Sequence, residues 1–549
     1  MRKLQAKLKI ELGRILGSWL FCLIAFSMVT VVAAQVIGWY NPAFIDSSIR
    51  HQWLLYMSVC FAVLACVSAI FYAPRLVRNK TLTRGIVILL IAVAILTVAV
   101  TTHALASQNH GWDVSTVDEI ARSYVSTGRM APPGDWNELY LAKYENNIPI
   151  VIVLITIYKI LGHVFGEHYT LYSQLLNSGS ILATFGIILF LAYKLYGLRS
   201  FFIAYLFGYV LIILSAYIPV TYTDTLGVVC VSLSLLILYM VTHLKGAGMY
   251  ISGFCFGLIM YAGYLIKPTV LFIGLAAAVG CLLLFLSKHS HFKVKAILLT
   301  IACCVMGIFA LYQAYGVVRS AYKGIDNYTI QTLEKNATPL EHFLAMGSFR
   351  GLSPYEECVK GSFCDRYVND VQAAPPSLDT VQERQDYALR LWERNVEVGF
   401  PFGYTSHLIN KMVLIYNDGS FGVWKEAEAK SQDIEFVRSS NMDTWVRSYM
   451  GPNGMYLAKF RAVQHGVWLA LLVMIMLGSI LAVRRQEHGY FAYVFGISLI
   501  LITLFLMIFE ARARYLFLYV PVFILLAVSQ GCAISEWLAA IKDKSYRRR

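Results

Sequence analysis

Charged residues are scarce in this chain. Of its 549 residues, 14% are Asp, Glu, Lys or Arg, whereas 58% are hydrophobic. Soluble domains usually carry about 25% charged residues, so the composition excludes an ordinary soluble protein. Uncharged apolar runs of the length that crosses a bilayer recur along the sequence instead. We therefore expect an all-α polytopic membrane protein with about 12–13 transmembrane helices.

Cysteine spacings that would hold a metal ion are also missing. Nine of the eleven cysteines lie in or beside apolar runs, where Cys acts as a small hydrophobic residue. The other two, Cys358 and Cys364 in CVKGSFC, stand in a long polar segment and can form a disulfide in an oxidising compartment. No spacing resembles a zinc site, and no internal repeat or low-complexity segment is visible.

Thirteen apolar runs are candidate spans, and two long polar segments, 105–147 and 318–462, interrupt them. The first run is too long for the apolar core of a signal peptide, so it is kept as a span. The candidates are residues 16–38, 53–72, 85–104, 148–165, 175–196, 201–218, 224–243, 250–266, 270–287, 296–317, 463–483, 490–509 and 515–538.

The net charge of +14 comes from short basic clusters between the apolar runs, which indicates membrane topology rather than nucleic-acid binding. Clusters such as MRKLQAKLK at the start and KDKSYRRR at the end are expected in the cytoplasm. Both termini then lie inside the cell, and both long polar segments lie outside it.

Two cytoplasmic termini require an even number of crossings, whereas thirteen runs are candidates. The conflict lies between the outer segment 105–147 and KLYGLRS at 194–200, whose basic residues indicate the cytoplasm. Either one of the runs 148–165 and 175–196 does not cross fully, or KLYGLRS is an exception and another span is misread. We favour twelve full crossings, with 148–165 re-entrant or lying shallow, covered by protein or a water-filled cavity.

Three carboxylates, Asp113, Asp118 and Glu119, follow a long uncharged run. The segment 113–127 has apolar residues at helical spacing before Gly128, which predicts a helix lying along the membrane surface. A carboxylate at the junction of span and surface helix is partly desolvated and becomes a better base, so Asp113 is a candidate catalytic residue. Asp also caps helices without any chemistry, and this stretch alone favours the cap.

Other polar residues stand where spans meet the outer surface, where ionisable groups are costly and often functional. Amides beside an acid can bind a polyol or cap a helix, and Arg and Lys bind phosphate. Alternatively, Glu510 pairs with a neighbouring arginine and locks two spans together. The residues are Glu145, Asn146 and Asn147 in KYENNIPIV, Tyr222, Thr223 and Asp224 in PVTYTDTLG, Lys267 in YLIKPTV, and Glu510, Arg512, Arg514 and Tyr515 in FEARARYLF.

On these residues the chain resembles the polytopic GT-C glycosyltransferases, especially bacterial relatives of the protein O-mannosyltransferases and of the aminoarabinose transferase of lipid A. Trp112-Asp113 is similar to the family's catalytic position, and the surface helix, NNIPIVIVLITIYKILG, PVTYTD and the KP turn follow in similar order. FEARARYLFLYVPVF resembles the final segment of Gram-positive cell-envelope members. TPLEHFLAMGSFRG, with His342, and NDGSFGVW, preceded by Lys411, are also similar to those members.

The resemblance implies a polyprenyl-phosphate sugar donor, a site outside the bacterial plasma membrane and inversion at the anomeric carbon. It implies Asp113 as the base with Asp118 or Glu119 as helper, and Lys267 and the 512–514 region as contacts of the donor phosphate. The metal site is unknown, because some members use a divalent cation such as Mg²⁺ or Mn²⁺ and others do not. The expected divisions are two additional spans in 1–84, a GT-C-like core in 85–317, an extracellular loop domain in 318–462 and the last spans and basic tail in 463–549.

We therefore expect an inverting glycosyltransferase that moves a sugar from the carrier to a hydroxyl of an envelope polymer, lipid or protein. The alternatives are a transporter or flippase of a lipid-linked sugar and a non-catalytic subunit of an envelope-synthesis complex. A transporter predicts charges along a path at mid-membrane and two related halves, and neither pattern is visible. In the outer segment, Tyr404, Tyr416, Phe421 and Trp424 can stack on sugar rings, but for each one a place in the segment's own core is favoured.

Overall fold

The computed structural model describes most of the chain, and all regular structure in the described residues is helical. Those residues are 2–37, 51–72, 80–105, 112–129, 136–287, 294–322, 337–358, 361–372, 378, 380–422, 440–451, 454–484 and 488–546. The expected all-α fold class is confirmed.

The helices follow the apolar runs closely, and short surface helices fill the two long polar segments. The first part of the chain forms α1 (Arg2–Ile37), α3 (Trp53–Tyr72), α4 (Lys80–Leu105), α5 (Trp112–Thr127), α6 (Trp136–Lys143), η3 (Glu145–Asn147), α7 (Ile148–Phe165), α8 (Tyr169–Tyr196), α9 (Leu198–Gly208), η4 (Tyr209–Ile213), α10 (Thr223–His243), α11 (Ala247–Ile266), η5 (Pro268–Val270), α12 (Leu271–Ser287) and α13 (Val294–Ala321). The second part forms α16 (Leu340–Ser348), α17 (Asp365–Gln372), α18 (Val381–Gly399), α19 (Phe402–Tyr416), α21 (Asn441–Met450), α22 (Leu457–Val483), α23 (Tyr490–Ile508), α24 (Arg514–Phe517) and α25 (Val520–Tyr546).

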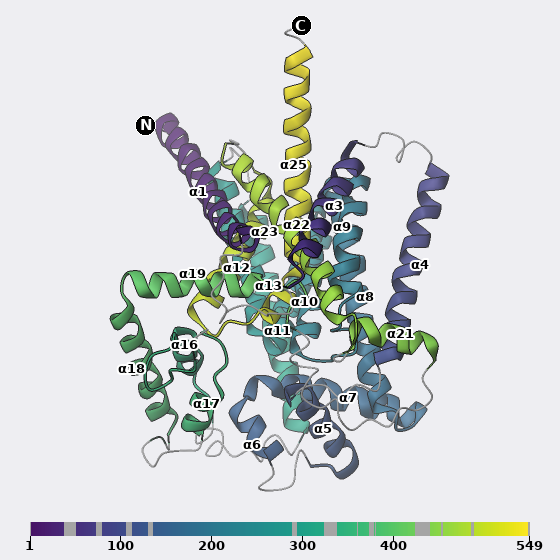
Figure 1. Ribbon diagram of the computed structural model, residues 1–549, viewed down its shortest axis with the longest axis vertical. Helices are drawn as coiled ribbons and strands as arrows, with labels where there is room; N and C mark the ends of the chain where they lie inside the picture. Colours follow the sequence, from purple (N-terminus) through teal and green to yellow (C-terminus); the bar gives the residue numbers. More distant parts are fainter. Residues whose placement is uncertain are drawn as a thin grey trace.

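Twelve helices in the described part of the chain are long and apolar enough to cross a membrane. They include 145–165, whereas the expected span 201–218 is a shorter apolar segment, Leu198–Ile213, that ends in a π-helical turn. Both termini lie at one end of the molecule, and α5, α6 and α7 lie toward the other end with α16–α18 (Figure 1). This arrangement agrees with an even number of crossings.

Helix α7 has the length of a span, but contacts near both of its ends connect it to α5. At its start, Asn147 reaches Asp113 of α5 through the hydroxyl of Tyr140. Just beyond its end, Arg122 of α5 donates to Thr170 Oγ1 over 2.8 Å. Asp113 and Arg122 are nine residues apart, about 14 Å along a helix, whereas the hydrocarbon core is about 30 Å thick.

Helix α7 therefore packs alongside α5. The segment from Leu198 to Tyr222 then returns the chain to the same end of the bundle, because the Tyr222 hydroxyl lies 3.5 Å from Asn147 Oδ1. The shallow position of 148–165 remains a prediction, since 145–165 is among the twelve helices that are long and apolar enough to cross.

The long polar segment 318–462 divides between two cores. Helices α16–α18 enclose a small hydrophobic core of their own, which contains the Cys358–Cys364 disulfide that the sequence allowed. Helices α19 and α21 instead pack against the bundle, and α19 runs across it in contact with α1 and α23 (Figure 1). The segment is thus only partly a separate domain.

Two aromatic residues proposed to stack on sugars belong to the bundle core instead. Tyr416 and Phe421 are fully buried and pack against Trp468 of α22, with ring centroids 6.3 and 5.1 Å away. They are core residues as predicted, but the core is that of the bundle and not the segment's own. Tyr404 is half-buried beside α18, and Trp424 lies outside the described residues.

Helices α11 and α13 approach closely because glycines face the partner backbone. A Cβ atom at Gly307 of α13 would lie 2.1 Å from Phe254 O, and one at Gly257 of α11 would lie 1.9 Å from Cys304 O. Small residues allow such close packing of helices in a membrane, where lipid provides no hydrophobic driving force between helices. The contact therefore depends on these two positions.

Gly307→Leu should separate α11 from α13 and lower the thermal stability of the detergent-solubilised protein by the equivalent of about 1–3 kcal/mol. Gly316→Leu, on the same helix, is the matched control, because no atom lies within 4 Å of its added Cβ. Melting can be followed by size-exclusion chromatography after heating. Equal melting temperatures for the two variants would contradict this account of the packing.

Candidate functional site

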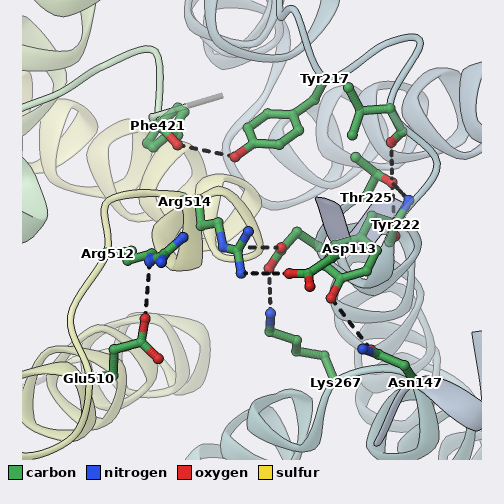
Figure 2. Close-up of polar contacts among 12 residues, drawn as sticks. Asp113, Asn147, Tyr217, Tyr222, Thr225, Lys267, Phe421, Glu510, Arg512 and Arg514 are labelled. Carbon is green, nitrogen blue, oxygen red and sulfur yellow. Dashed lines mark hydrogen bonds and ion pairs between the residues drawn. The ribbon is translucent and has the colours of Figure 1, made fainter. Parts of the chain in front are cut away.

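The surface helix α5 carries the first acidic residue of the site. Its apolar face, Val117, Ile120, Ala121 and Tyr124, is buried as predicted, and Gly128, with φ of 74°, follows its end. Asp113 lies in the first turn of this helix. Because the buried face fixes the rotation of α5, the Asp113 side chain points into the interior of the site (Figure 2).

The start of α10 supplies a second carboxylate. The backbone N–H of Tyr222 donates to Thr225 Oγ1 over 3.1 Å, and the Thr225 hydroxyl donates to Val220 O over 2.9 Å, so the first turn is held by local bonds. Asp224 lies in that turn with a side chain only 2% exposed. A carboxylate so deeply buried needs a cationic partner.

Lys267 is that partner. It precedes Pro268, and the residue before a proline favours extended backbone, so α11 ends at Ile266 and Lys267 adopts φ of −151°. Its Nζ lies 2.7 Å from Asp224 Oδ1. The same Nζ lies 4.7 Å from the centre of the Tyr515 ring, at cation–π distance.

Arg514 joins the two acids from the far end of the chain. Its NH2 lies 3.7 Å from Asp113 Oδ2, and its Nε lies 4.0 Å from Asp224 Oδ2 (Figure 2). The guanidinium also lies over the rings of Tyr222, at 5.9 Å, and Tyr515, at 5.3 Å. We call Asp113, Asp224, Lys267 and Arg514 the Arg514 cluster.

The two arginines of FEARARYLF have separate partners. Arg512 pairs with Glu510 over 3.0 Å and lies 4.9 Å from the Phe363 ring of the disulfide loop, whereas Arg514 belongs to the cluster. The ion pair expected from Glu510 is therefore made by Arg512 within one turn. The ion pair therefore does not join two spans, and it is the contact of Arg512 with Phe363 that connects the segment after α23 to the disulfide loop.

Asp118 and Glu119 lie away from the cluster. Asp118 pairs with Arg122 over 2.6 Å and accepts a hydrogen bond from the Tyr158 hydroxyl of α7, while Glu119 is exposed. Of the three acids that follow the first outer junction, the structure brings only Asp113 to the cluster. Their helical spacing explains the difference, since positions five and six residues on face other sides of α5.

The residues of KYENNIPIV separate in the same way. Glu145 is exposed and lies 3.4 Å from Arg319, and Asn146 is exposed beside it. Asn147 is buried, with 2% of its surface exposed, and its amide faces Tyr140 and Tyr222. The structure thus places Asn147 behind Asp113 rather than on an open surface.

Tyr140 of α6 is the residue of the site that sequence reasoning missed. It is buried, and its hydroxyl donates to Asp113 Oδ1 over 3.1 Å. In WNELYLAKY it is one tyrosine among 35 in the chain, so neither its spacing nor its neighbours single it out.

His342 and Lys411 lie outside the cluster. His342 stacks on Tyr367 in the core of α16–α18, where burial, and secondarily Arg384, lowers its pKa to about 3. Lys411 of α19 is completely buried, and its Nζ donates to Gly347 O over 2.8 Å and to Phe509 O over 2.7 Å. Lys411 therefore fastens α16 to the segment that leads into Arg512 and Arg514.

Burial lowers the pKa of Lys411 from 10.5 to about 7, and Glu510 acts in the opposite direction. Between these two pH values the unfolded chain holds a proton that the native protein has lost, so raising the pH favours the native state. Compared with Lys411→Met, the wild-type protein should gain up to about 1.4 kcal/mol of stability per pH unit from pH 7 toward pH 10.

The measurement is the difference in melting temperature between wild type and Lys411→Met from pH 6 to pH 9.5. Lys411→Met should be less stable throughout, because two buried carbonyl oxygens lose their donor. A difference that stays constant with pH would contradict the lowered pKa.

The described residues contain one group of three side chains whose ligand atoms are close enough for a metal ion, Glu357, Cys358 and Cys364. Its two cysteines are joined in the disulfide. In the Arg514 cluster, both carboxylates face cationic side chains, which repel a divalent cation. The use of Mg²⁺ or Mn²⁺ remains a prediction from the family resemblance.

We compared the chain with protein families, curated proteins and solved structures. A family model described as "Conserved hypothetical integral membrane protein" matches residues 19–531. No curated protein matches the chain. Among solved structures, the crystal structure of ArnT from Cupriavidus metallidurans bound to undecaprenyl phosphate matches with 14% identity over 81% of this chain and 77% of that chain, with a TM-score of 0.31.

Proposed function

We propose that this chain, which belongs to the family of conserved hypothetical integral membrane proteins, is a glycosyltransferase that takes its sugar from a polyprenyl-phosphate carrier. The observation that carries the proposal is the position of Arg514, between Asp113 and Asp224 and on the same side as Lys267. A base and two phosphate-binding cations are then within reach of one substrate. The fold in this proposal is of the GT-C type.

In the proposed reaction, Asp113 accepts the proton of the acceptor hydroxyl, and the hydroxyl oxygen attacks the anomeric carbon of the sugar. The bond between that carbon and the phosphate oxygen breaks, and its electron pair stays on the phosphate. Lys267 and Arg514 stabilise the charge that develops there. Attack from the side opposite the leaving phosphate inverts the anomeric configuration.

The difference in exposure supports Asp113 rather than Asp224 as the base. The Asp113 side chain is 31% exposed, whereas that of Asp224 is 2% exposed and bonded to Lys267. An acceptor hydroxyl can reach the first but not the second. Asp224 instead neutralises the two cations while they wait for a phosphate, because like charges at this depth are costly without a counter-ion.

The proposal places the reaction outside the bacterial plasma membrane. The two ends of the chain, whose basic clusters predict a cytoplasmic position, lie at the end of the molecule opposite to α5–α7 (Figure 1). The lipid donor would enter from the bilayer and the acceptor, a hydroxyl of an envelope polymer, lipid or protein, from the outer side. A lipid-linked sugar flippase is the alternative, and it would need no base.

Asp113→Asn should lower the rate of sugar transfer by about 100-fold or more, because the amide cannot accept the proton. Asp118→Asn is the matched control, since Asp118 lies on the same helix but pairs with Arg122. The assay is transfer of radiolabelled sugar from the lipid carrier in a membrane preparation. Unchanged transfer in Asp113→Asn would reject this residue as the base. If the wild-type protein moved the lipid-linked sugar across the membrane but transferred no sugar, the flippase would be favoured.

Arg514→Gln should weaken the binding of a polyprenyl phosphate about tenfold or more, because a charge-assisted contact to the phosphate is lost. Arg319→Gln is the control, since Arg319 of α13 pairs with the exposed Glu145 and not with a residue of the Arg514 cluster. Binding can be measured with fluorescent polyprenyl phosphate and the purified protein in nanodiscs. Equal affinities for the two variants would count against the phosphate site.

A further inference from the structure

Two consecutive hydrogen bonds connect Asn147, through Tyr140, to Asp113. Asn147 Nδ2 donates to the Tyr140 hydroxyl oxygen over 2.7 Å, and that hydroxyl donates to Asp113 Oδ1 over 3.1 Å. A phenol has a single proton. Because Asn147 occupies the acceptor side of the phenol oxygen, the proton of Tyr140 is directed toward the carboxylate.

The orientation of the Asn147 amide is itself determined by its other neighbours. Its Oδ1 accepts from Asn146 Nδ2 over 3.2 Å and faces the Tyr222 hydroxyl at 3.5 Å. In this orientation the Asn147 oxygen faces two donors, and its NH₂ group faces the Tyr140 oxygen. The hydrogen bonds then run in one direction, from Tyr222 and Asn146 through Asn147 to Tyr140.

Burial keeps the phenol in its donor form. Tyr140 and Asn147 are 3% and 2% exposed. Burial raises the pKa of Tyr140 well above its ordinary value, and the nearby Tyr222 and Asp113 raise it further. Tyr140 therefore donates to Asp113 at every pH at which the protein would work.

We propose that Tyr140 and Asn147 are positioning residues that select which oxygen of Asp113 acts as the base. Oδ1 is bonded to Tyr140, so Oδ2, 3.7 Å from the Arg514 guanidinium, is the oxygen that meets the acceptor hydroxyl. The proton is then taken up beside the cation that would hold the donor phosphate. This inference rests on the proposed function, in which Asp113 is the base.

The groups that face Asp113 are Tyr140 from α6, Tyr222 at the N-cap of α10 and Arg514 from the segment after α23. Tyr140 donates to Oδ1, and the Arg514 guanidinium lies beside Oδ2. Removal of the Tyr140 hydroxyl should therefore let the carboxylate rotate away from the orientation in which Oδ2 meets the acceptor hydroxyl.

The test is Tyr140→Phe, which removes one oxygen atom and leaves the ring. We expect kcat to fall about tenfold and KM for the lipid donor to stay within about twofold, because the base is misplaced while the donor contacts remain. Tyr158→Phe is the matched control, because its buried hydroxyl donates to Asp118 instead. The control should leave kcat and KM unchanged.

Asn147→Leu, which is close to Asn in shape, tests the next bond in the chain. It should lower kcat as Tyr140→Phe does, and it should add nothing in the Tyr140→Phe background, since it acts through that hydroxyl. Fully additive effects would show that Asn147 acts independently of Tyr140 and would overturn its place in the chain.

Infrared spectra of ¹³C-aspartate-labelled protein, with Asp113→Asn subtracted, follow the Asp113 carboxylate without any assay of activity. A carboxylate stretching band that shifts in Tyr140→Phe, where Oδ1 loses its donor, supports the positioning role even if Asp113→Asn still transfers sugar, which would reject only the proposed function. Identical Asp113 bands in wild type and Tyr140→Phe would overturn the inference, whatever the activity of Asp113→Asn.

Discussion

The Arg514 guanidinium, from near the end of the chain, holds together two carboxylates from the first half of the chain, and the geometry of the candidate site depends on it. Asp113 comes from the surface helix α5, Asp224 from the start of α10, and Arg514 from the turn after α23. None of these groups can be buried at the membrane end of a bundle alone, because the desolvation of an unpaired charge is prohibitive. Their mutual pairing fixes how the three elements meet.

Helix α7 is held to α5 by contacts near both of its ends. It has 18 residues, enough to cross a bilayer, yet Asn147 before its start reaches Asp113 through Tyr140, and Thr170 beyond its end accepts from Arg122. The first of these contacts brings Tyr140 and Asn147 next to Asp113. A helix that looks like a span in length thus serves as a wall of the site.

The outer core of α16–α18 is joined to the site through backbone atoms. Lys411 bridges Gly347 O and Phe509 O, and the N–H of Ala511 donates to Gly361 O in the disulfide loop over 2.9 Å. A Cβ atom at Gly347 would lie 2.3 Å from Ile508 O, so the contact requires glycine there. The disulfide loop and the arginine segment therefore behave as one rigid unit, which explains why Glu510 and Arg512 pair within it.

Composition and periodicity alone determine that this chain is an all-α membrane protein, because a run of about 20 apolar residues has no other stable environment. They also predict the helix with Asp113 in its first turn and the turns that carry Lys267 and Arg514. These features are local, since each depends on residues within one or two turns of one another.

The tertiary structure alone decides which polar residues meet. It separates Asp113 from Asp118 on one helix, Arg514 from Arg512 in one turn, and it adds Tyr140, which no local signal marks. It also turns Asn147 inward. The physical reason is that pairing between buried charges and hydrogen-bonding groups depends on the rotation and contact of helices far apart in sequence, and nothing within a single segment specifies that rotation.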